Sequence, residues 1–140
     1  MYKSWLVINL NKKYFLKVGN KLFRCQIGTE GVKNPAKKVE GDKTTPSGRW
    51  HLESLYYRSD RVSRPKLKKK NILKINRITQ HCGWCDDVSS KYYNKYINTK
   101  CSSLNKISYE RLWREDNAYD IIIEMSYNTK PIIKNKGSAI

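Results

Sequence analysis

The first 27 residues alternate apolar and polar side chains in three short runs, and this pattern constrains the fold more than any other feature. The runs are Trp5–Leu10, Tyr14–Val18 and Leu22–Ile27. Alternation with a period of two is typical of β-strands. Between the second and third runs, the dipeptide Gly19-Asn20 tolerates positive φ and favours a tight hairpin turn. We therefore predict a β-meander and a mostly β fold rather than a βαβ fold.

Two later segments indicate strands, and one indicates a helix. Arg49–Tyr57 alternates again and is predicted as a fourth strand, whereas the β-branched run Tyr119–Met125 is typical of a buried central strand. Asn105–Asp116 has helical spacing of its apolar residues, with Ser108 placed as the N-cap and Glu110 in the first turn. The predicted fold class is a mostly β sheet or sandwich with one or two short helices.

The length of 140 residues fits a single domain spanning 1–140. Hydrophobic residues make up 39%, and 4 Trp and 10 Tyr supply large side chains for a core, so we expect a folded chain. Trp5–Leu10 is too short, and too soon followed by Lys12, to be a signal peptide. No apolar run reaches the length of about 20 residues that spans a bilayer.

The chain is strongly basic, with 29 Lys and Arg against 12 Asp and Glu and a net charge of +17. Such a field attracts polyanions, and nucleic acid, anionic lipid headgroups and cell-wall polymer are all candidates. A compositional bias toward Lys, Asn, Ile and Tyr would explain the charge without any binding role. The basic segment Arg58–Lys70, which Pro65 interrupts, is predicted to be an exposed loop or extension, and Lys66–Lys70 is its most concentrated charge. The segment has a weak claim as a nucleic-acid patch, because its arginines and lysines are not interleaved with stacking aromatic residues.

The string His81–Cys85 looks the most reactive, and a zinc site is one interpretation besides simple packing. Such a site would combine His81 or Cys82 with Cys85 and Cys101. Zinc prefers four ligands in two close pairs, and Cys101 has no near Cys or His neighbour. The second pair of ligands is therefore missing from the sequence pattern.

Two other interpretations of this string involve a reactive thiol. A thioredoxin-like dithiol belongs at the start of a helix after a strand, a context that the neighbouring sequence lacks. A catalytic Cys–His pair would need His81 or His51 beside a thiol, although adjacent residues point apart on a strand and His51 is most simply structural. Asp86-Asp87 would suit a base-orienting or cation-binding role, but consecutive acids after such a turn are more often a solvated turn pair.

The segment Gly41–Gly48 has the glycines of a phosphate loop but lacks its Gly-Lys-Ser/Thr ending. Pro46 also removes an N–H that a phosphate would need. Its Pro and Gly residues instead predict a sharp turn that leads into the strand at Arg49.

This loop, together with several later motifs, resembles the YkuD-type L,D-transpeptidase domain family. The string Glu40–Gly48 followed by an aromatic strand is similar to the signature of that family. Motifs similar to a bacterial subgroup follow in the same order: Gly83–Asp87, Tyr93-Asn94, Glu110–Asp116, Tyr119-Asp120, the strand through Glu124 and the lead-in Lys136–Ile140. The matches cover nearly the whole chain, and several ordered motifs are more specific than any one of them.

The resemblance implies a β-rich YkuD-like fold that cross-links peptidoglycan in the cell envelope, with stem peptides as partners and no cofactor or metal. In this family a Cys thiolate attacks the amide carbonyl of a donor stem peptide, expels D-alanine and passes the acyl group from a thioester to an acceptor amine. The thiolate is a strong nucleophile, a nearby His manages the protons, and backbone N–H groups stabilise the oxyanion.

The nucleophile of the family lies in a Ser/Thr-x-Gly-Cys motif preceded by a His, and neither motif occurs in the 140 residues. Cys85 lies in the Gly-Trp-Cys-Asp-Asp motif instead, so we assign no catalytic residue within the chain. Because the sequence stops on Ser138–Ile140, the start of an apparent strand, we expect the catalytic domain to be incomplete at its C-terminus and inactive alone.

The alternative from another class is a basic nucleic-acid-binding module. In its metal-containing form it would hold a zinc ion on Cys82, Cys85 and Cys101. The salt dependence of DNA or RNA binding separates the two hypotheses, because phosphate contacts weaken steeply with salt.

Overall fold

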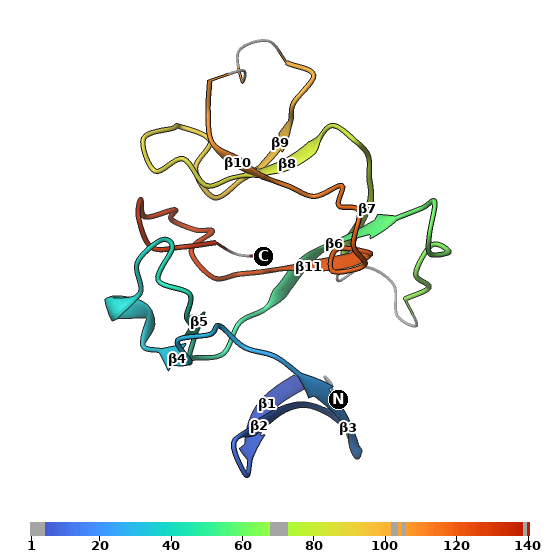
Figure 1. The fold of residues 1–140 in the computed structure, drawn as a ribbon, viewed down its shortest axis with the longest axis vertical. Helices are drawn as coiled ribbons and strands as arrows, with labels where there is room; N and C mark the ends of the chain where they lie inside the picture. The colour runs from blue at the N-terminus through green and yellow to red at the C-terminus, as the bar shows by residue number, and fades with distance from the viewer. Residues whose placement is uncertain (1–4, 68–72, 102–103, 105, 139) are drawn as a thin grey trace.

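The computed structural model describes residues 5–67, 73–101, 104, 106–138 and 140, and in this part the chain forms four small sheets (Figure 1). The mostly β fold class is thus confirmed. A single-turn 3₁₀ helix, η1 (Pro35–Lys37), interrupts the strands. The strands are β1 (Trp5–Leu10), β2 (Lys13–Val18), β3 (Lys21–Cys25), β4 (Val32–Lys33), β5 (Thr45–Pro46), β6 (Leu52–Arg58), β7 (Lys74–Ile78), β8 (Cys82–Cys85), β9 (Tyr96–Asn98), β10 (Tyr109–Arg111) and β11 (Ile121–Met125).

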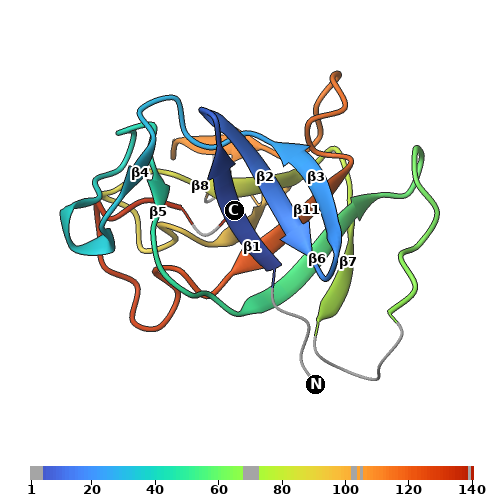
Figure 2. The same cartoon turned by 90° about the horizontal axis from the view of Figure 1, so that it is seen from below.

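The predicted N-terminal meander is confirmed. β1 pairs with β2 and β2 with β3, both antiparallel. Asn11 and Lys12 both have positive φ (51° and 62°), as tight hairpin turns require, and Gly19 has φ of 60° in the second turn. The three strands lie below the rest of the protein in Figure 1 and in front of it in Figure 2. Within the described residues, none of them pairs with another sheet.

The main core lies between two stacked sheets. Figure 1 shows the sheet β10-β8-β9 above the sheet β11-β6-β7. In the lower sheet β6 pairs antiparallel with β11 and parallel with β7, so the sheet is mixed. Both sheets contribute side chains to one buried cluster, which consists of Tyr56, Ile78, Cys82, Trp84, Leu112 and Ile122. The expected sheet or sandwich arrangement is therefore built from short strands.

The predicted helix over Asn105–Asp116 is wrong. Tyr109–Arg111 is strand β10, which pairs antiparallel with β8, and Leu112 continues the pairing by donating its N–H to the carbonyl of Cys82 (3.1 Å). Leu112 is fully buried in the main core. Hydrogen bonds and burial against a distant strand therefore outweigh the local helical spacing. Residue 105 lies outside the described residues.

Two strand predictions are confirmed with changes. The strand expected over Arg49–Tyr57 begins at Leu52 and runs to Arg58. The strand expected over Tyr119–Met125 begins at Ile121, but it lies at the edge of its sheet, and β6 is the central strand. Ile121, at the start of this edge strand, is exposed, whereas Ile122 is buried in the main core.

Two further predictions fall partly outside the described residues. Of the basic segment Arg58–Lys70, residues 58–67 are described, and the predicted loop is wrong at Arg58, which ends β6 and is buried because it bonds to Asp60 and to the carbonyl of Arg114. Lys66 and Leu67 are exposed. Ser138 and Ile140 belong to no strand, residue 139 is not described, and Ile140 packs against the main core. The described part of the chain contains no helix long and apolar enough to cross a membrane.

Candidate functional site

Tyr93 is the centre of a hydrogen-bonded network that joins segments far apart in the sequence. Its hydroxyl donates to Oε2 of Glu40 (2.5 Å) and accepts from the backbone N–H of Gly137 (2.8 Å). The side chain of Tyr93 is only 2% exposed. Burial, and then the hydrogen bond to the Glu40 carboxylate, raises the pKa of Tyr93 well above its ordinary value. The hydroxyl therefore remains protonated and acts as a donor.

The network continues through two asparagines. Trp84 Nε1 donates to Asn94 Oδ1 (2.9 Å), and Asn94 Nδ2 donates to the carbonyl of Asn128 (2.8 Å). The side chain of Asn128 in turn donates to the carbonyl of Gly137 (3.0 Å). Both asparagines have positive φ (54° and 52°), a conformation that asparagine tolerates better than most residues. Gly137 is therefore held at its N–H by Tyr93 and at its carbonyl by Asn128.

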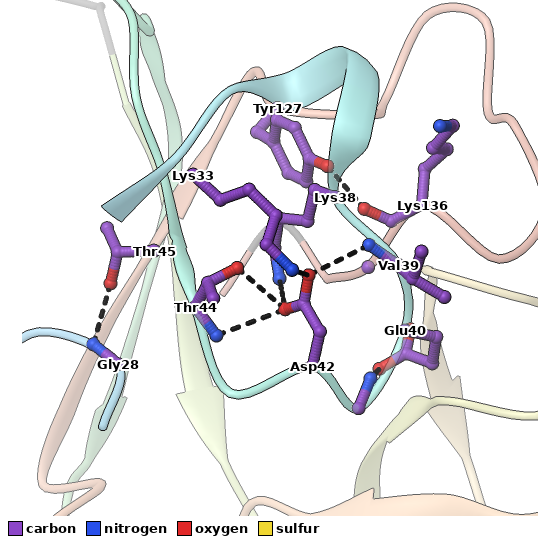
Figure 3. A network of polar contacts seen from close by, with 12 residues as sticks. Gly28, Lys33, Lys38, Val39, Glu40, Asp42, Thr44, Thr45, Tyr127 and Lys136 are labelled. Atoms are coloured by element: carbon purple, nitrogen blue, oxygen red, sulfur yellow. Dashed lines mark hydrogen bonds and ion pairs between the residues drawn. The ribbon is translucent and has the colours of Figure 1, made fainter. Parts of the chain in front are cut away.

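The turn predicted over Gly41–Gly48 is organised by the carboxylate of Asp42 (Figure 3). Asp42 accepts hydrogen bonds from the ammonium groups of Lys38 (2.8 Å) and Lys33 (3.0 Å). It also accepts from the backbone N–H of Val39 (3.0 Å) and from the N–H and hydroxyl of Thr44 (3.0 and 2.7 Å). These bonds, with Lys38 contributing most, hold the pKa of Asp42 far below its usual range. The loop thus directs its donors at its own side chain, which agrees with a turn rather than a phosphate loop.

The Asp42 turn is joined to the segment Lys136–Ile140. Glu40 donates its N–H to the carbonyl of Asn135 (3.1 Å), and Lys136 Nζ donates to the carbonyl of Ala36 (2.7 Å). The hydroxyl of Tyr127 donates to the carbonyl of Lys136, as Figure 3 shows. Four motifs of the family resemblance, which contain Glu40, Trp84, Tyr93-Asn94 and Lys136-Gly137, are therefore in one network.

The string Cys82–Cys85 forms β8 and is entirely buried. Cys82 and Trp84 lie in the main core, whereas Cys85 packs with Ile97 and Leu104 in a second cluster. A Cβ on Gly83 would stand 2.7 Å from the Tyr109 ring, so a larger residue there would force the ring to shift. Both faces of β8 are buried, so its side chains pack alternately into the two clusters. The structure therefore supports packing as the interpretation of this string.

The Cys82 thiol is not paired with a histidine. Cys82 Sγ is bonded to the Tyr96 hydroxyl (3.0 Å) and lies 3.1 Å from the N–H of Thr79, so its partners are not histidines. The described residues contain no group of three or more His, Cys, Asp or Glu that could hold a metal ion. The zinc set of Cys82, Cys85 and Cys101 is accordingly not brought together, because β8 places Cys82 and Cys85 in different clusters and Cys101 is exposed.

The two acids after β8 have different surroundings. Asp87 accepts from the N–H (2.9 Å) and the hydroxyl (2.6 Å) of Ser89, and these bonds lower its pKa. This geometry confirms a turn role for Asp87. Oδ1 of Asp86 is buried without a hydrogen-bond partner in the described part of the chain.

His51, a structural residue in our interpretation, donates its backbone N–H to the hydroxyl of Ser126 (2.9 Å).

A cavity of about 330 Å³ adjoins the network and shares Trp84 and Asn94 with it. Its other lining residues are two tyrosines, four charged residues, a threonine and an isoleucine: Tyr56, Tyr96, Glu53, Glu124, Lys95, Lys130, Thr129 and Ile132. A larger hollow of about 440 Å³ over Arg111 and Trp113–Asp116 shares no residue with the network. We therefore take the smaller cavity and the network around Tyr93 as the candidate site.

The cavity wall combines stacked aromatic rings with fixed charges. Tyr56 and Tyr96 stack with centroids 5.7 Å apart, and the Tyr56 hydroxyl donates to Glu124 Oε2 (3.3 Å). Burial, and then the negative charge of Glu124, raises the pKa of Tyr56 to about 12. Lys130 Nζ lies 3.6 Å from Glu53 Oε1. Anionic and cationic groups therefore border one aromatic surface.

Sequence reasoning missed most of this cavity. Glu124, Trp84 and Asn94 were named through the resemblance, but Tyr96 and Lys130 carried no signal. Tyr96 comes from β9, while Lys130 follows β11, so no short motif contains both. A spacing rule has nothing to detect when the pairing of distant strands creates a cavity.

Comparison of the chain with protein-family models, curated proteins and solved structures finds no significant match. The resemblance to the L,D-transpeptidase family therefore stays a prediction, and the geometry of the site is the basis for a functional proposal.

Proposed function

We propose that this chain is the scaffold part of a YkuD-type, L,D-transpeptidase-like domain that acts in peptidoglycan cross-linking. The observation that supports this proposal is the network around Tyr93. The Tyr93 hydroxyl bridges two other motifs of the family resemblance, because it is hydrogen-bonded both to Glu40 and to Gly137. Such convergence is typical of residues that a fold uses to position one functional segment.

In this proposal the segment that the network positions is Lys136–Ile140, the lead-in to the catalytic part of the family. Gly137 is fixed at both its N–H and its carbonyl, and Ile140 packs against the main core. In the family that the chain resembles, the catalytic His and Cys follow the corresponding segment, and an anchored segment leaves them little freedom of position. Proximity and orientation account for a large share of the rate of acyl transfer.

The chain by itself carries out no acyl transfer in this proposal. Cys82 and Cys85 are buried, and the partners of the Cys82 thiol are not histidines. Thioester formation needs a thiolate beside a base and an oxyanion site, and the 140 residues lack the Ser/Thr-x-Gly-Cys motif that supplies the nucleophile. In this proposal the role of the 140 residues is to bind and orient the donor stem peptide.

The cavity beside the network is the proposed site for the donor stem peptide. A stem peptide carries amines and carboxylates on a short backbone, and its ends would meet opposite charges at Glu124 and Lys95. The stacked rings of Tyr56 and Tyr96 offer an apolar surface to the side chains between them. On this proposal the chain works in the cell envelope, where such peptides occur.

Calorimetric titration with a synthetic donor stem peptide ending in D-alanine tests the proposal. Lys95→Gln should weaken binding by about tenfold, because it removes one charge-assisted contact while the residue keeps its shape. Lys91→Gln is the matched control, since Lys91 lies over the Tyr92 ring and outside the cavity, and it should bind like the wild type. The proposal fails if the peptide does not bind, or if intact-mass spectrometry finds a stable thioester on any of the four cysteines.

A further inference from the structure

The β1–β3 meander gathers basic and apolar side chains on one face. The register places Leu10 opposite Lys13, Phe15 opposite Arg24 and Lys17 opposite Leu22. Opposed residues share a face, and residues two apart along β2 also share it. We call this set the basic–apolar face: Leu10, Lys13, Phe15, Lys17, Leu22 and Arg24.

This face is exposed although it carries large apolar side chains. Leu10 and Leu22 are 46% and 48% exposed, and Phe15 is half-buried. Within the described residues, no strand of another sheet pairs with the meander. Leu10 and Leu22 lie at opposite corners of the face, and the half-buried pair Ile8 and Phe15 lies between them, so the apolar surface is continuous only through this pair. A continuous apolar surface with a polar rim is typical of an interaction surface. The meander therefore has a surface that suits a partner.

The charge of the meander restricts what that partner can be. Residues 5–25 contain five basic residues and no Asp or Glu, and three of the five lie on the basic–apolar face. Among the described residues, no ion pair involves Lys13, Lys17 or Arg24. The positive charge is thus not neutralised within the described chain and is complementary to an anionic surface. A second copy of the same face would bring like charges together.

We propose that the basic–apolar face docks this protein on the surface of an anionic lipid bilayer. The basic side chains would meet headgroup phosphates, and Leu10 and Leu22 would enter the boundary between headgroups and acyl chains. Nucleic acid would satisfy the charges but would leave both leucines in water, so the pairing of the two residue types favours lipid. This inference is independent of the acyl-transfer proposal, because the face shares no residue with the cavity.

Cosedimentation of the 140-residue chain with vesicles tests the proposal. The chain should bind vesicles of phosphatidylcholine mixed with phosphatidylglycerol far better than vesicles of phosphatidylcholine alone. The triple variant K13Q/K17Q/R24Q should lower the partition coefficient about a hundredfold, since each charge near the surface contributes roughly fivefold. The double variant L10S/L22S keeps the net charge and should lower the partition coefficient about tenfold or more.

The control variant K37Q/K66Q/K106Q has the same net charge as the triple face variant, and all three of its lysines are exposed. It should keep most of the binding. Equal losses for the two triple variants would mean diffuse attraction and would overturn the proposal. Unchanged binding of L10S/L22S would indicate a purely electrostatic surface, as for nucleic acid, and would also overturn it.

Hydrogen exchange on the unaltered chain gives a readout that does not depend on the folding of variants. Anionic vesicles should slow amide exchange in Lys13–Val18 and Lys21–Cys25 and leave Cys82–Cys85 unchanged. Protection confined to other strands would contradict docking through the meander.

Discussion

Replacing Tyr93 with phenylalanine removes one hydroxyl and leaves the ring in place. That hydroxyl makes two hydrogen bonds, one to the carboxylate of Glu40 and one from the N–H of Gly137. Because the side chain is buried, water cannot readily replace the lost group at the Gly137 N–H. The variant therefore isolates the contact that joins the Asp42 turn to the lead-in segment.

The expected loss follows from these two bonds. A hydrogen bond to a charged group contributes about 1.5–3 kcal/mol, and an unsatisfied buried donor costs about 1–3 kcal/mol. Glu40 is only half-buried, so water recovers part of its loss, and we expect the free energy of unfolding to fall by about 3 kcal/mol. Urea denaturation at neutral pH, followed by tryptophan fluorescence, measures this difference.

Tyr92→Phe is the control at the neighbouring position. Tyr92 donates its backbone N–H to the hydroxyl of Ser90 (3.0 Å), a bond that the substitution keeps, and its ring lies under Lys91. Removal of the Tyr92 hydroxyl should change the free energy of unfolding by less than about 0.5 kcal/mol. If Tyr93→Phe is as mild as this control, the network does not hold the lead-in segment and the reasoning is refuted.

Four other measurements bear on the structure. Gly83→Ala should lower the free energy of unfolding by about 1–3 kcal/mol, seen in thermal melts, because its Cβ would stand 2.7 Å from a ring atom of Tyr109. The pKa of Asp42 is lowered on folding, so its ionised form stabilises the protein above the ordinary carboxyl value of about 3.9 and this stabilisation is lost as pH falls below it. Asp42→Asn should therefore flatten the acid side of a plot of urea midpoint against pH, and a parallel shift at all pH values would argue against ion pairing. The pKa of Tyr56 is raised to about 12 on folding, so its neutral form stabilises the protein below the ordinary tyrosine pKa of about 10. This stabilisation is lost as pH rises toward 12. Tyr56→Phe should therefore make the urea midpoint fall less steeply with pH in this range. Zinc and a chelator should both leave the melting temperature unchanged, and a rise with zinc would revive the metal-binding alternative.

The parts of the fold that depend on local pattern could be predicted from the sequence. The meander is specified by alternation within Trp5–Cys25 and by a Gly-Asn turn, and both signals lie within a few residues of the strands they determine. The turn at Gly41–Gly48 is local only in part: Gly41 and Gly48 permit the positive φ that they adopt, whereas Thr45–Pro46 within the predicted turn forms β5, which pairs with β4. The carboxylate of Asp42 then fills the turn, and its two lysine partners are close to it in the sequence.

The prediction failed where a distant strand decides the structure. Tyr109–Leu112 has the apolar spacing of a helix, yet its backbone pairs with β8 and Tyr109 packs over Gly83. The edge position of β11 is also invisible in its own sequence, because a β-branched run fits a central or an edge strand.

The candidate site was predictable only in part. Glu40, Tyr93 and Asn94 belong to motifs that the resemblance singled out, but no motif states that Tyr93 bonds to Gly137. That contact depends on the packing of the loop after β11 against the Asp42 turn. The cavity is less predictable still, since β6, β8 and β9 each contribute one of its aromatic residues.

Nuclear magnetic resonance titration of the isotope-labelled chain with the donor stem peptide shows where, and whether, the peptide binds. Our account predicts shifts concentrated on the indole N–H of Trp84 and the side-chain amide of Asn94, the two groups shared by the cavity and the network. Absence of shifts, or shifts confined to β1–β3, would contradict the proposal that these residues form the scaffold of a peptide-binding acyl-transfer domain.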